Sequence, residues 1–137
     1  LISAPIGRNS HNPTKFTVLS GGRPSETYYE VIEWLGEYSL LRVYPKTGRT
    51  HQIRVHLKHI GHPLVSDPVY AGRKTYRKDT EFCPRLFLHA ARLSLKHPVS
   101  RRVMTFESPL PKDLTQVLCH CEDFARGRVS SVRRVGI

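Results

Sequence analysis

The first third of the chain contains the clearest alternation of hydrophobic and polar positions. Residues 26–35 (ETYYEVIEWL) repeat every two residues and are rich in aromatic and β-branched side chains, which predicts a strand. Gly36 and Glu37 then lead into residues 38–45 (YSLLRVYP), which predict a second strand. Because only a short turn separates the two strands, we expect an antiparallel hairpin.

Residues 50–60 follow the helical period instead. Thr50 is a candidate N-cap for this helix, and Gly61 is its stop signal. Apolar side chains recur at helical spacing and form one stripe: Ile53, Leu57 and Ile60. We therefore expect a helix that packs one face and leaves another face free to bind.

The free face of this helix is basic, and a basic turn precedes it. Side chains three and four residues apart form the face: His51, Arg54 and Lys58. Residues 47–49 come just before the helix N-terminus, where unpaired backbone N–H groups and the helix dipole favour an anion such as phosphate. Arg49 adds its fork of N–H donors to this turn. The bland alternatives are a turn arginine at position 49 and a packed, helix-start histidine at position 51.

The second half of the chain predicts one more hairpin and one more helix. Residues 86–95 (LFLHAARLSL) fit a short helix or a buried strand, and their second half favours a strand. Residues 102–107 form its antiparallel partner across the turn HPVSRR. A last helix begins near Lys112, because apolar residues fall at i, i+3, i+4 and i+7: Leu114, Val117, Leu118 and Cys121.

Length and composition indicate one domain. The chain has 137 residues, of which 39% are hydrophobic, and this fits a modest core. We assign residues 1–124 to the domain and residues 125–137 to a basic tail, which is either a disordered arm or an added strand. No apolar run approaches the roughly 20 residues that span a bilayer, so a soluble protein is expected. Its expected location is the cytoplasm or, in a eukaryote, an organelle. Three cysteines are too few for a disulfide framework and are expected as free thiols.

The charge of the chain points to a polyanionic partner. The formal net charge is +11, and residues 38–66 contain no Asp or Glu. This acid-free segment carries five cations: Arg42, Lys46, Arg49, Arg54 and Lys58. Such clustering favours nucleic acid, which binds basic proteins by releasing its counterions. A basic surface that serves solubility alone is the alternative.

The histidines and cysteines do not follow a metal-binding pattern. Among the four histidines of residues 51–62, only His56 and His59 share a side of the predicted helix. Three successive helical residues, as at 119–121, point about 100° apart and cannot converge on one ion. Packing of Cys121 in the core explains that triplet better. These spacings predict no metal site. Residues 46–48 lack the order of a nucleotide-binding loop, so no nucleotide cofactor is expected either.

Four blocks of the chain, in this order, carry a family resemblance: GRTHQIRVHL, GHPLVSDPVYAG, PRLFLHAARLSLKHP and FESPLP. Together they resemble the RluA-type RNA pseudouridine synthase family, over residues 2–114. The resemblance implies an α+β fold with a mixed, largely antiparallel sheet flanked by helices. It also implies a cofactor-free isomerase that detaches a uridine base in structured rRNA or tRNA, rotates it and rejoins it through carbon.

The resemblance assigns roles to two side chains. Family members pair a catalytic aspartate, in a His-Arg-Leu-Asp block, with an arginine, and a tyrosine contacts the base. Only the arginine is present here, as Arg54, while Leu88 corresponds to the apolar wall of the base pocket. We expect Arg49, His51 and Lys58 to bind the RNA. Asp67 matches a structural position of the family, so Arg54 is expected to lack its carboxylate partner.

Three functions fit these observations. The first is a piece of a pseudouridine synthase that is inactive alone because the segment with the catalytic aspartate is missing. The second is a non-catalytic RNA-binding protein derived from the family, and the third is a basic interaction domain without RNA. For Arg54 the alternative is a surface arginine, and for Leu88 it is a core residue. A partial sheet is expected to expose an edge and apolar surface, and the oligomeric state stays open.

Overall fold

The computed structural model describes residues 1–127, apart from the side chain of Phe124. The central element of its fold is a long antiparallel hairpin. It consists of β4 (Glu26–Leu35) and β5 (Tyr38–Pro45), whose ends pair in register across the turn. A short strand, β1 (Ile2–Ser3), pairs with β4 and gives the order β1-β4-β5. The hairpin predicted for residues 26–45 is therefore confirmed.

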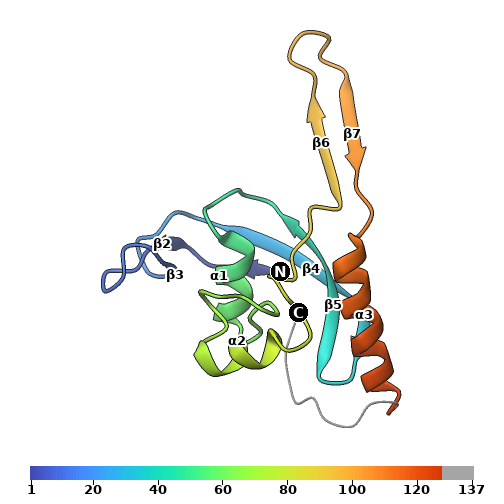
Figure 1. Ribbon diagram of the computed structural model, residues 1–137. Helices are drawn as coiled ribbons and strands as arrows, with labels where there is room; N and C mark the ends of the chain where they lie inside the picture. Colours follow the sequence, from blue (N-terminus) through green and yellow to red (C-terminus); the bar gives the residue numbers. More distant parts are fainter. Residues whose placement is uncertain (128–137) are drawn as a thin grey trace.

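Two smaller antiparallel pairs lie outside this sheet. Strands β2 (Ile6–Arg8) and β3 (Phe16–Val18) pair near the N-terminus. Strands β6 (Arg92–Lys96) and β7 (Val103–Glu107) form the predicted second hairpin, which projects away from the rest of the molecule (Figure 1). Every residue of β6 and β7 is exposed, including the apolar Leu93, Val103 and Phe106.

Helix α1 (Gln52–His59) confirms the predicted helix but buries more of its surface than the apolar stripe suggests. Leu57 is fully buried, and the stripe packs in a cluster with Leu64. Val55 and His56 are buried as well, although neither belongs to the predicted stripe. The helix therefore has packed neighbours on more than one side.

The ends of α1 show one correct and one incorrect prediction. Gly61 follows the C-cap with φ 85°, the left-handed conformation that glycine adopts without strain, and so confirms the stop signal. Thr50 is not the N-cap. His51 occupies that position in a left-handed conformation, with φ 56° and no side-chain cap. The side chain of Gln52 instead binds the backbone N–H of Arg49, so the turn is held from inside the helix.

Two further helices complete the fold. Helix α2 (Arg73–Asp79) has no counterpart in the sequence prediction. Helix α3 (Lys112–Ala125) begins where the apolar spacing predicts. Its buried face packs against the turn end of the β4–β5 hairpin in one cluster: Leu35, Tyr38, Leu114, Val117 and Cys121.

The whole is an α+β fold with antiparallel pairing among its described strands, as predicted. All three cysteines are free thiols, and Cys121 is buried in the core as expected. Among the described helices, none has the length and apolarity to cross a membrane. Most of the basic tail, from residue 128 on, lies outside the described residues.

Candidate functional site

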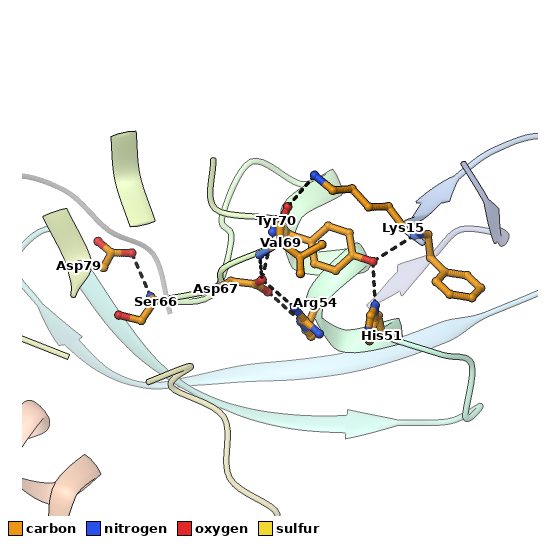
Figure 2. A network of polar contacts seen from close by, with 9 residues as sticks. Lys15, His51, Arg54, Ser66, Asp67, Val69, Tyr70 and Asp79 are labelled. Carbon is orange, nitrogen blue, oxygen red and sulfur yellow. Dashed lines mark hydrogen bonds and ion pairs between the residues drawn. The ribbon is translucent and has the colours of Figure 1, made fainter. Parts of the chain in front are cut away.

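Arg54 forms a bidentate salt bridge with Asp67 at the centre of the network in Figure 2. Its Nε donates to Oδ2 at 2.9 Å, and its Nη2 donates to Oδ1 at 2.8 Å. The carboxylate is fully buried, whereas the arginine side chain keeps 14% of its surface exposed. The guanidinium also lies over the ring of Tyr70, 5.0 Å from its centroid. The expectation that Arg54 lacks a carboxylate partner is therefore wrong for this chain.

One edge of the Arg54 guanidinium is left without a partner among the described residues. Arginine has five N–H donors in a fixed plane, and the two bonds to Asp67 use two of them. The occupied edge fixes the plane, and the remaining donors point along the other edge. The pair thus presents an oriented cation that is able to bind a second anion.

Asp67 is held by the backbone that follows it. The N–H groups of Val69 and Tyr70 donate to Oδ1 at 2.9 and 3.0 Å. Burial alone raises the pKa of this carboxyl, but the hydrogen bond from Arg54 and the two backbone N–H groups outweigh burial, so the pKa lies below its usual value. Asp67 is therefore ionised at neutral pH and fixed before any ligand arrives.

The loop that carries Asp67 is also anchored on its other side by Asp79. The backbone N–H of Ser66 donates to Asp79 Oδ2 at 3.0 Å, and the Ser66 hydroxyl donates to the Cys83 carbonyl at 2.6 Å. Asp79 is fully buried, and its Oδ1 has no hydrogen-bond partner in the described part of the chain. Burial raises the pKa of Asp79 to about 6, against the opposing hydrogen bond from Ser66. This carboxyl is a structural anchor that carries an ionisation cost at neutral pH.

His51 and Arg54 meet on the same tyrosine. His51 Nδ1 lies 2.9 Å from the Tyr70 hydroxyl, which also accepts the backbone N–H of Phe16 at 3.1 Å. Nδ1 of a neutral His51 and the Tyr70 hydroxyl therefore share one hydrogen bond, whose direction is set by the His51 tautomer. Burial, followed by the positive charge of Arg54, lowers the pKa of His51 and favours this neutral form. Two predicted site residues are thus brought together around Tyr70.

Gln52 ties the turn before α1 to strand β4. Its Oε1 accepts the Thr47 hydroxyl at 2.7 Å and the Arg49 backbone N–H at 3.0 Å. Its Nε2 donates to the Glu26 carbonyl at 2.9 Å and to the Thr27 hydroxyl at 3.1 Å. Every polar atom of this buried amide has a partner, so Gln52 fixes where the basic turn lies.

His56 continues this chain of hydrogen bonds inside the protein. Its Nδ1 lies 2.8 Å from the Thr27 hydroxyl, and its Nε2 lies 2.9 Å from the Ala4 carbonyl. A carbonyl only accepts, so Nε2 carries the proton and Nδ1 accepts from Thr27. Burial lowers the pKa of this fully enclosed histidine. His56 is a neutral structural residue, and the apolar periodicity of the sequence marks neither its role nor that of Gln52.

The three other predicted site residues lie in different surroundings. Arg49 lines a cavity of about 410 Å³, and Lys58 lines another of about 340 Å³. Neither of these cavities is lined by Arg54. Leu88 is half-buried and packs with the core cluster that includes Leu57 and Leu64. This agrees with the alternative that Leu88 is a core residue. The described contacts therefore join His51 to Arg54 but leave Leu88 apart from both.

The acid-free segment of residues 38–66 does not form a single basic face. Arg42 lies on β5 and forms an exposed pair with Glu30 at 3.3 Å. Arg54 is paired with Asp67, and only Arg49 and Lys58 of the remaining cations line a described cavity. The linear clustering of charge thus overstates how many of these cations act together.

The chain is similar to known proteins that all carry the description of RNA pseudouridine synthases. The family described as RNA pseudouridylate synthase matches residues 1–59. An uncharacterized RNA pseudouridine synthase of Chloroflexus aurantiacus is 48% identical over 90% of this chain and 38% of its own length. The ribosomal large subunit pseudouridine synthase D of Nitrosomonas europaea is 42% identical over 95% of this chain and 39% of its own length. The chain thus spans about two fifths of the length of these relatives.

A solved structure supports the same relationship. Human RNA pseudouridylate synthase domain containing 1 superposes with a TM-score of 0.64 at 35% sequence identity. The match covers 80% of this chain and 47% of the human chain. The structural match and the sequence matches therefore point to the same family.

Proposed function

The chain belongs to the RluA-type RNA pseudouridine synthase family, and from that premise we propose that the protein isomerises uridine to pseudouridine in structured RNA. In this reaction the bond from ribose to the base nitrogen breaks, the base turns, and ribose rejoins the base through a ring carbon. That carbon loses a proton and the nitrogen gains one. Reactant and product have the same atoms and oxidation state, so the reaction needs no redox cofactor.

Arg54 is our candidate for the arginine of the catalytic pair. The observation that carries this proposal is the fixed guanidinium, which Asp67 binds along one edge and which leaves its other edge without a partner. We propose that this second edge pairs with the catalytic aspartate of a His-Arg-Leu-Asp block elsewhere in a longer polypeptide. A close cation keeps such a carboxylate ionised and oriented. Asp67 acts as the residue that positions Arg54.

The substrate is proposed from two sources. The net charge of +11 favours a nucleic acid, and the ribosomal large subunit enzyme named above favours ribosomal RNA over transfer RNA. A uridine in a stack has to be flipped out before a pocket is able to enclose it, at a cost of a few kcal/mol. His51 beside Tyr70 and the half-buried Leu88 are our candidates for contacts to the flipped base.

The alternative is a non-catalytic RNA-binding protein derived from the family. It is favoured by Arg54 already having a carboxylate partner within this chain. One experiment separates the two functions. Ribosomal RNA transcripts are incubated with the full-length protein and, separately, with the 137-residue chain, and pseudouridine is mapped by chemical modification and primer extension. We expect pseudouridine from the full-length protein and none from the chain alone. A full-length protein that binds RNA but forms no pseudouridine supports the alternative.

A further inference from the structure

Two neighbouring cavities near the β2–β3 pair have a strongly one-sided charge. The arginine cavity, of about 410 Å³, is lined by Arg8, Arg23 and Arg49. The lysine cavity, of about 340 Å³, is lined by Lys15 and Lys58. Among the described residues, no aspartate or glutamate lines either cavity. Phe16 lines both of them and therefore stands between the two groups of cations.

Backbone contacts fix the position of the arginine cavity. Arg23 and Ile6 exchange two backbone hydrogen bonds, of 2.8 and 2.9 Å, which pin Arg23 beside strand β2. A Cβ atom at Gly22 would lie 2.7 Å from the carbonyl carbon of Ile6, so this close approach requires glycine. Backbone contacts therefore fix this part of the cavity wall, from which the Arg23 side chain extends.

Most of the guanidinium donors at this cavity are unused within the described part of the chain. Arg8 donates from Nη1 to the Pro13 carbonyl at 3.0 Å and lies over the ring of Phe16, 5.5 Å from its centroid. Arg49 donates from Nε to the Pro24 carbonyl at 3.3 Å. These contacts orient two guanidinium groups while leaving four of the five donors of each without a partner. Three cations without a carboxylate repel one another until an anion joins them.

We propose that the arginine and lysine cavities bind phosphates of one RNA strand, on either side of Phe16. Guanidinium forks match the oxygens of a phosphate, and a concave surface of one sign concentrates an anionic ligand. Two such cavities joined through one aromatic side chain suit a polyanion with repeated charges rather than a single small anion. This assignment rests on the proposed function only in taking RNA as the polyanion. Arg54 itself lines neither cavity, and Tyr70, over whose ring its guanidinium lies, also lines the lysine cavity.

The test measures how RNA affinity depends on salt. Affinity of the full-length protein for a fluorescein-labelled RNA hairpin with a single-stranded loop is measured by anisotropy across a salt series. Each lost phosphate contact reduces the slope of log affinity against log salt by about 0.7. The triple change Arg8→Gln, Arg23→Gln and Arg49→Gln should make the slope shallower by about 2 and lower affinity about 100-fold near 0.1 M salt. The pair Lys15→Gln and Lys58→Gln should make it shallower by about 1.4.

A charge-matched control lies on the projecting β6–β7 hairpin (Figure 1). The change Lys96→Gln, Arg101→Gln and Arg102→Gln removes the same three charges and should leave the slope unchanged. An equal effect of both triple changes, or no effect of the cavity change, overturns the assignment. Arg23→Gln alone removes no described side-chain contact, so its slope change of about 0.7 tests the cavity even if the triple variant fails to fold.

The binding assay also separates this assignment from the proposed function. If the parent protein forms pseudouridine but the cavity variants keep its salt slope, the cavities do not bind RNA phosphates and the proposed function stands. A protein whose slope changes as expected but which forms no pseudouridine refutes the proposed function alone.

Discussion

Replacing Asp67 with asparagine tests whether the Arg54 pair organises the site. The change keeps the shape of the side chain and removes its charge. One of the two Arg54 donors then faces an amide N–H group, and the other faces an uncharged oxygen. The carboxylate is fully buried, and the arginine side chain is 14% exposed. Breaking a buried pair at one partner costs about 3–5 kcal/mol, because the other charge is left without compensation. Arg54 retains some exposure, so we expect the lower end, about 3 kcal/mol.

The measurement is the free energy of unfolding from urea titration at pH 7, made on the full-length protein. A matched control is Asp113→Asn, because Asp113 forms the same two-bonded pair with Arg85 at the surface, where each side chain keeps more than 40% of its exposure. Exposed pairs contribute little, so this control should change stability far less than Asp67→Asn. Combining Asp67→Asn with Arg54→Met should recover part of the loss, because neither member of the pair then carries a charge. Equal effects of Asp67→Asn and Asp113→Asn would refute the reasoning.

Three further predictions concern the core around the site. The pKa of Asp79 rises from 3.8 to about 6 on folding, so the parent protein loses up to about 3 kcal/mol of stability as pH rises from 4 to 7. Urea titrations should show Asp79→Asn gaining that amount relative to the parent over the same range, and a pH-independent difference would count against it. The pKa of His56 is lowered from 6.5 by burial, so the parent should lose stability relative to His56→Gln as pH falls below about 6.5, by at most about 1.4 kcal/mol per pH unit. A parallel pH dependence of the two proteins would show that His56 titrates normally. Leu57→Ala should cost about 2–5 kcal/mol in the same assay, because Leu57 is fully buried, and a loss below 1 kcal/mol would contradict the packing of α1.

Much of the fold was predictable because it is local. The β4–β5 hairpin follows from two-residue alternation around a short turn, and α3 follows from apolar spacing alone. Gly61 ends α1 because a left-handed residue is needed there. The short helix α2 was missed, since RKTYRKD has no apolar stripe to mark it.

The candidate site was only partly predictable, because its partners are distant in sequence. Asp67 is 13 residues from Arg54, and no periodicity connects them. Gln52 and His56 are polar, so a helical pattern places them at the surface, whereas hydrogen bonds to Thr27 keep both buried. One signal was available. Gln52 and His56 are four residues apart and therefore share a helix face, which suggests a common partner.

The partnership of Arg54 and Asp67 also changes which variant is informative. Arg54→Ala would leave Asp67 buried without its cation, so lost activity could arise from lost stability. Arg54→Lys keeps the charge and gives up the two-edged fork that we propose bridges Asp67 and the catalytic aspartate.

The most direct measurement is therefore the single-turnover rate of pseudouridine formation by full-length protein carrying Arg54→Lys, with RNA affinity measured in parallel. We predict a rate on the order of 100-fold below the parent, because positioning of a charged partner contributes several kcal/mol to such steps. RNA affinity should stay within about twofold of the parent, since the phosphate contacts proposed above lie elsewhere. A rate close to that of the parent would contradict the account.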